Sequence, residues 1–195
     1  AFELHISRTR KALIAAEVLR TPALIISDDI ARGLISPAER FRIGRALFLI
    51  SEGALPLLDM TTRRALALLA ALGQVATPPC PLPLDVDQET LARESARLEQ
   101  VTEPEERRRL GEALPGLAAS LEGADLDRFK AALQRGANRA GLAVAGDPLR
   151  ALQEAGSLED ARGVGPLTAD LLTFLVDPRF IALRRELGLS PGAGG

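Results

Sequence analysis

The chain has 195 residues, 47% of them apolar and 26% charged, a composition that predicts a folded domain with a real core and excludes a disordered segment. The formal net charge is -2, and acidic residues surround the short basic run at 107–109, so we expect no nucleic-acid partner. No apolar run has the roughly 20 residues that a membrane span needs. A single cysteine, Cys80, excludes an internal disulfide, and we expect a cytoplasmic protein without a membrane span.

The first 35 residues predict a small β-layer. Residues 2–6 alternate apolar and polar, which predicts a strand with Phe2, Leu4 and Ile6 on one face and His5 on the other. Residues 23–27 form a β-branched run that predicts a second strand, whereas 12–18 fit either a strand or a helical turn. One further helical turn is expected at 30–34.

Residues 36–51 predict the helix on which the rest of the fold is organised. Ser36 caps its start, Pro37 occupies the first helical position, and Glu39 completes a capping box. The residues that follow are apolar on more than one face, which is typical of a central helix. Gly44 lies in its interior, where glycine is unfavourable, and so predicts that another segment approaches the backbone closely.

The remainder predicts a helical region in one domain. The expected fold is α+β and predominantly α, a single domain over residues 1–189 with a proline-rich connector at 78–83 and a flexible tail at 190–195. Asp59 is expected to start a helix that Gly73 ends, and Pro115 to break a later helix. The other expected segments are a helix over 87–101, a long helix over 126–144, a short helix from 148, a glycine-containing loop over 156–165, a helix after Pro166 and a last helix that starts at Asp177-Pro178.

Two segments carry a family resemblance. Residues 41–50 read FRIGRALFLI, and residues 134–141 read QRGANRAG. In this order they resemble the active-site helix and the later glutamate-bearing helix of the M48-type gluzincin metallopeptidases, in which the first helix carries His-Glu-x-x-His. The resemblance places Gly44, Arg45 and Phe48 at the His, Glu and His positions. It places Gln134 at the third zinc ligand and Asn138 at the following Asp.

The resemblance therefore implies a zincin-like fold that has lost its chemistry. A catalytic zinc needs three His, Cys or carboxylate ligands and an open position, and the chain has one His and one Cys in total. We expect no bound metal, no cofactor and no peptidase activity. Arg45 is the candidate contact for a peptide or an anion, and Gln134 is expected within side-chain reach of Gly44 and Phe48.

Other chemistry has weaker support in the sequence. A nucleophilic Cys–His pair would require His5 beside Cys80, and nothing in the spacing predicts it. Asp28 and Asp29 with Arg45 are the alternative for an enzyme of another class, although adjacent acids after a strand more often cap the next turn. A plain helical scaffold without zincin ancestry is the third reading.

The expected function is a non-catalytic pseudo-peptidase domain that acts as a structural or protein-interaction module of a larger bacterial protein. Its partner would be another protein or other domains of the same parent chain. Because the sequence starts at Ala1, directly in an alternating run, we expect a piece of a longer or processed chain.

Overall fold

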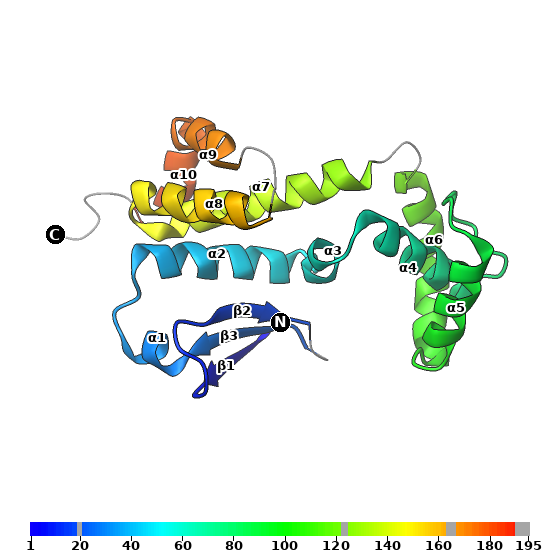
Figure 1. Ribbon diagram of the computed structural model, residues 1–195. Helices are drawn as coiled ribbons and strands as arrows, with labels where there is room; N and C mark the ends of the chain where they lie inside the picture. Colours follow the sequence, from blue (N-terminus) through cyan, green and yellow to red (C-terminus); the bar gives the residue numbers. More distant parts are fainter. Residues whose placement is uncertain (19–20, 122–124, 163–166, 190–195) are drawn as a thin grey trace. The chain divides into compact units, whose positions relative to one another are not determined.

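The computed structural model describes residues 1–18, 21–121, 125–162 and 167–189. Three strands come first and helices follow (Figure 1), which confirms the predicted α+β, predominantly α fold. No helix in these ranges is long and apolar enough to cross a membrane. The elements are β1 (Glu3–Ser7), β2 (Ile14–Glu17), β3 (Ala23–Ser27), α1 (Asp28–Arg32), α2 (Pro37–Ser51), α3 (Leu55–Asp59), α4 (Thr62–Ala76), α5 (Gln88–Glu99), α6 (Pro104–Leu121), α7 (Leu126–Ala145), α8 (Pro148–Arg162), α9 (Leu167–Leu175) and α10 (Pro178–Glu186).

The chain divides into two compact units. The first unit combines Ala1–Pro56 with Ala131–Gly195, and the second is Leu57–Lys130. The predicted connector at 78–83 therefore lies inside the second unit. A single zincin-like domain over residues 1–189 stays a prediction, and the predicted flexible tail at 190–195 lies outside the described residues.

The sheet of the first unit has the strand order β1-β3-β2, with β1 parallel and β2 antiparallel to the central strand. This assignment settles the ambiguity at 12–18 in favour of a strand. Leu24 and Ile26 of β3 are buried against Ala46 and Ile50 of α2, so one face of the sheet packs on the central helix. In Figure 1, α2 lies between the sheet and the helices α7 and α8.

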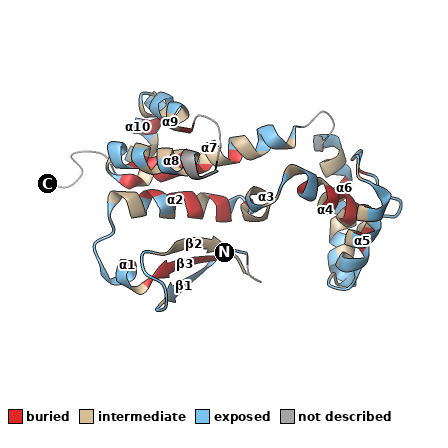
Figure 2. Cartoon of the chain, viewed as in Figure 1, coloured by how far each residue is buried: buried red, intermediate tan, exposed pale blue. Residues whose placement is uncertain are grey.

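The opposite side of α2 contributes to the second core cluster of this unit. Phe41, which is fully buried, packs with Leu142 of α7, Leu171 of α9 and Phe180 of α10. Within the first unit, Figure 2 shows buried positions along α2, α7 and β3, whereas β1 is mostly exposed. The predicted central role of residues 36–51 is therefore confirmed.

The predicted start of α2 is also confirmed. The Ser36 hydroxyl accepts a hydrogen bond from the Glu39 N–H at 3.3 Å, and the Glu39 carboxylate accepts one from the Ser36 N–H at 2.6 Å. Pro37 occupies the first turn. This capping box satisfies two N–H groups that the helix itself leaves unpaired, and such caps contribute about 1 kcal/mol.

In the second unit, α4 differs from its predicted bounds at both ends. It begins after Thr61, whose hydroxyl accepts from the Arg64 N–H, and it continues through Gly73 to Ala76. The predictions that Asp59 caps this helix and that Gly73 ends it were wrong. A Cβ atom on Gly73 would lie 2.7 Å from Cys80 Sγ and 3.4 Å from Leu82, so this glycine makes room for the proline-rich segment.

Two other predicted breaks are absent from the described helices. α6 runs through Pro115, beside Leu114, which is only 4% exposed. α8 runs through Gly156 to Arg162, so a loop over 156–162 was a wrong prediction, and 163–166 lie outside the described residues. Ala155 of α8 is fully buried in the core. In both helices, tertiary burial outweighs the local preference of one residue.

Candidate functional site

The candidate site lies where α2 and α7 touch through glycines. A Cβ atom on Gly44 would lie 2.6 Å from Val144 Cγ2 and 3.0 Å from both the Ala140 carbonyl oxygen and Gly141 Cα. A Cβ atom on Gly141 would lie 2.6 Å from the Phe41 carbonyl oxygen. The backbones of the two helices therefore approach each other closely at these glycines, which confirms the close approach predicted at Gly44.

Phe48, one turn further along α2, continues this contact. Its ring lies against Gly136, where a Cβ atom would be 2.5 Å from Phe48 Cζ. The two His positions of the resemblance, Gly44 and Phe48, thus both face α7. They meet Gly136, Ala140 and Val144, which lie on one side of that helix.

The two amide positions of the resemblance lie on another side of α7. Gln134, Asn138 and Gly141 follow one another at helical spacing of four and three residues, so they share one side of the helix. Gln134 is about 200° around the helix from Gly136, and its side chain leaves α7 on a different side from the Phe48 contact. Its expected reach to Gly44 and Phe48 stays a prediction.

Both amides are buried in an unusual way. Asn138 is 0% exposed, and neither its Oδ1 nor its Nδ2 has a hydrogen-bond partner among the described residues. Gln134 Oε1 is likewise buried without a partner. Buried polar atoms of this kind lower the free energy of unfolding because they lose their hydrogen bonds to water. The Asn138 amide therefore destabilises the fold.

Arg45, at the Glu position of the resemblance, lies inside the same contact. It is only 8% exposed, and its guanidinium carbon is 5.8 Å from the centre of the Phe41 ring. A Cβ atom on Gly141 would lie 3.0 Å from the Cγ atom of Arg45. The role of Arg45 as a contact for a peptide or an anion stays a prediction.

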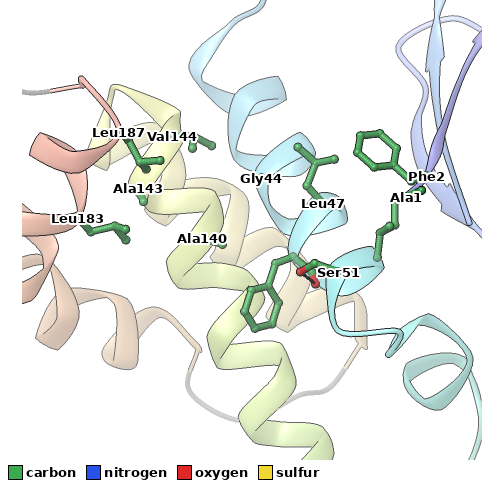
Figure 3. A pocket seen from close by; sticks show the side chains of 12 residues that line it. Ala1, Phe2, Gly44, Leu47, Ser51, Ala140, Ala143, Val144, Leu183 and Leu187 are labelled. Carbon is green, nitrogen blue, oxygen red and sulfur yellow. Dashed lines mark hydrogen bonds between the residues drawn. The ribbon is translucent and has the colours of Figure 1, made fainter.

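A hollow of about 560 Å³ opens beside this contact. Figure 3 shows Phe2 near Leu47 of α2, Ala140 and Val144 on α7, and Leu183 and Leu187 near the end of α10. The complete lining is Ala1, Phe2, Gly44, Leu47, Phe48, Ile50, Ser51, Ala140, Ala143, Val144, Leu183 and Leu187.

The hollow is chemically apolar. Its one polar side chain, Ser51, donates its hydroxyl hydrogen to the Phe48 carbonyl oxygen at 2.8 Å. The side chains of the lining include no acid, base or metal ligand, and the hollow suits an apolar side chain. Sequence reasoning identified Gly44 and Phe48 but missed the hollow, because its lining comes from four separate segments.

Asp28 and Asp29, the carboxylates of the alternative enzyme hypothesis, make local hydrogen bonds. Asp28 accepts a hydrogen bond from Arg32 at 2.8 Å, and Asp29 accepts one from the N–H of Ala12, a residue with φ of 52°. Hydrogen bonds from Ser27 and from the Ala12 N–H lower the pKa of Asp29. These two carboxylates are therefore engaged in fixing α1 and the turn before β2.

The two residues of the Cys–His alternative belong to different units of the chain, His5 to the first and Cys80 to the second. His5 Nε2 lies 2.9 Å from Glu3 Oε2, and the Cys80 N–H donates to Gln74 Oε1 at 2.8 Å. Within the described ranges, no three His, Cys, Asp or Glu side chains gather as metal ligands would.

A further polar contact, which sequence reasoning missed, ties α7 to α9. Arg139 donates to both oxygens of Asp170, at 2.9 Å from Nε and 2.6 Å from Nη2. The guanidinium also lies 5.1 Å from the centre of the Phe174 ring. One side chain thus makes a bidentate ion pair and a stacking contact, both of which depend on its planar shape.

We predict that Arg139→Lys lowers the free energy of unfolding by about 1–2 kcal/mol, because lysine keeps the charge and loses the fork and the stacking. Urea unfolding followed by circular dichroism measures this change. The control is Arg32→Lys, which alters an exposed i,i+4 pair and should leave stability unchanged. Equal stability of Arg139→Lys and the original chain would contradict the prediction.

No family model, curated protein or solved structure matches the chain.

Proposed function

We propose that this chain is a non-catalytic, metal-free pseudo-peptidase domain of gluzincin-like ancestry. In this proposal it serves as a structural or protein-interaction module of a larger bacterial protein, in the cytoplasm, and its partner is a protein or another part of the parent chain. The observation that carries the proposal is the backbone contact of α2 with α7. Two of the three metal-ligand positions of the resemblance, Gly44 and Phe48, lie within it.

The geometry of this contact supports the loss of a metal site. A histidine at position 44 would bring its Cβ to 2.6 Å from Val144 Cγ2 and 3.0 Å from Gly141 Cα, so the Val144 side chain or the helices would have to shift to admit it. Phe48 fills the second position with a ring that packs on Gly136. A catalytic zinc needs side-chain ligands around an open coordination position, and this interface provides packed carbon atoms instead.

The apolar hollow supports a binding role. Its lining consists mainly of leucine, phenylalanine and alanine side chains. Pockets of this apolar character bury anchoring aliphatic or aromatic residues at protein interfaces. Leu187 stands at this site and is 49% exposed, so it is available to a partner. We propose that an apolar side chain of a protein segment occupies the hollow.

Selection of peptides from a displayed random library tests the binding role. We expect enriched peptides to share a large apolar residue, and binding to fall at least about tenfold in Leu187→Asp, which places a charge in the lining. The matched control is Leu34→Asp, because Leu34 is fully exposed and lies outside the hollow. Absence of enriched peptides, or equal loss in both variants, would refute the binding role.

A metal measurement tests the non-catalytic role separately. After dialysis against buffered zinc, we expect the purified chain to retain well below one equivalent and to leave an unfolded protein substrate intact. Retention of one equivalent of zinc, together with its loss in Gln134→Ala, would overturn the proposal.

A further inference from the structure

Strand β1 has an open edge. The order β1-β3-β2 leaves its outer side without a neighbour among the described strands. The Glu3 N–H donates to the Pro22 carbonyl oxygen at 2.9 Å, so Glu3 and His5 direct their backbone groups toward β3. In a parallel ladder alternate residues bond to the same neighbour, and the N–H and C=O groups of Leu4 and Ile6 therefore point to the open edge.

The same strand carries an uncovered apolar row. Leu4 and Ile6 pair with Leu24 and Ile26 of β3, so they lie on the sheet face that packs on α2. The row is not covered by that helix: Leu4 is 58% exposed, Ile6 is 54% exposed, and Phe2, which precedes them, is 47% exposed. Edge strands usually carry charges on such a face to prevent pairing, and β1 carries none there.

We propose that two copies of this chain pair through their β1 strands, antiparallel and centred on Leu4. In this register Leu4 faces Leu4 of the second copy, and Phe2 faces Ile6 of the second copy. On the other face, Glu3 of each copy lies opposite His5 of the other. The surface is thus complementary to itself, as a two-fold interface requires, and the pairing goes beyond the proposed function because it needs no peptidase ancestry.

Charge selects this register over its neighbours. A shift of one residue along the strand would turn the apolar row of one copy to the opposite face. A pair centred on Glu3 would place two carboxylates directly opposite each other, which is repulsive. A pair centred on His5 would place two imidazoles opposite each other, with no carboxylate facing either. Only the Leu4 centre brings a carboxylate to each imidazole, a combination that already bonds within one strand at 2.9 Å.

The backbone phase agrees with this register. Leu4 presents its N–H and C=O to the open edge, so the two Leu4 residues form a hydrogen-bonded pair with Cα atoms about 5.5 Å apart. Glu3 and His5 then form the intervening non-bonded pairs, whose Cα atoms are about 4.5 Å apart and whose side chains are closest. Ile6 of the second copy lies opposite Phe2, beside the hollow that Phe2 lines.

Sedimentation of the complete chain over about 1–500 µM tests the pairing. We expect a concentration-dependent dimer, and an increase of at least about tenfold in its dissociation constant for Leu4→Lys, which places two ammonium groups on the symmetry axis. Leu34→Lys is the control, since Leu34 is an equally apolar and fully exposed residue of the same unit. A monomer throughout this range, or equal effects of both variants, would overturn the proposal.

A charge exchange tests the register. His5→Glu should weaken the dimer because it places Glu3 opposite a second carboxylate, and Glu3→His combined with His5→Glu should restore it because the exchanged pair is complementary again. Failure of the double variant to recover the original dissociation constant would overturn the Leu4-centred register. Cross-linking provides a second measurement: in a Cys80→Ala background, Leu4→Cys should oxidise to a disulfide-linked dimer and Leu34→Cys should not.

Discussion

Replacing Gly141 with alanine is expected to lower the free energy of unfolding by about 1–3 kcal/mol, although alanine is the better helix former. The added methyl group would lie 2.6 Å from the Phe41 carbonyl oxygen and 2.7 Å from its ring. The first of these atoms belongs to the backbone of α2, so relief requires the two helices to move apart. That movement would loosen the cluster in which Phe41, Leu142 and Leu171 are buried.

Urea unfolding followed by circular dichroism measures this loss, and hydrogen exchange of the α2 amides assigns it to the first unit. The matched control is Gly156→Ala in α8 of the same unit. The nearest atom to its added methyl group would be Thr168 Oγ1 at 3.9 Å, an ordinary contact. There the gain in helix propensity should dominate and raise stability by up to about 1 kcal/mol. Equal gains in both variants would show that α2 and α7 are not in backbone contact.

Asn138→Leu is expected to change stability in the opposite direction, raising the free energy of unfolding by about 1–3 kcal/mol. Leucine has the same branching at Cγ but a larger volume, so tighter packing at this fully buried position offsets part of the gain. The substitution removes two polar atoms that have no hydrogen-bond partner among the described residues. Their desolvation then no longer opposes folding.

The same urea experiment measures this gain. Gln134→Leu should raise stability less, because only its Oε1 is buried without a partner. The exposed control is Gln153→Leu in α8, whose amide oxygen accepts a hydrogen bond from Arg150 at the surface, and it should change stability by no more than about 0.5 kcal/mol. A loss of stability in Asn138→Leu would contradict the prediction and assign the buried amide a bonding role.

The sequence correctly predicted where two helices begin, because the capping hydrogen bonds there join residues close together in the chain. The capping box of Ser36 and Glu39 is present as predicted, and Asp177 caps α10. Hydrogen bonds from the Arg179 side chain and N–H lower the pKa of Asp177 to about 2. Such bonds join residues two or three positions apart, so a single sequence contains all the partners.

The wrong predictions concern residues whose surroundings come from distant parts of the chain. Gly73, Pro115 and Gly156 are typical helix breakers, yet each lies inside a helix. Burial of their neighbours, such as Leu114 at 4% exposure and Ala155 at 0%, outweighs a local cost of about 1 kcal/mol for glycine and about 3 kcal/mol for proline. That burial depends on which helices pack together, which local sequence does not specify.

Some features of the candidate site and of β1 were predicted from the sequence, and others were not. The interior position of Gly44 predicted a close approach, and Phe2, Leu4 and Ile6 were correctly placed on one face of a strand. The sequence did not identify Gly141 as the residue that meets Gly44. It also did not reveal that the apolar row of β1 is left uncovered by α2.

The fold class, the order of strands before helices and the central place of residues 36–51 follow from local sequence, because periodicity and capping act over a few residues. Packing between distant segments sets three further features: two ligand positions of the gluzincin resemblance meet α7 through glycines, the buried Asn138 has no hydrogen-bond partner among the described residues, and β1 forms an open apolar edge of the described sheet. These features arise where segments nearly 100 residues apart pack together, and their geometry depends on both partners at once.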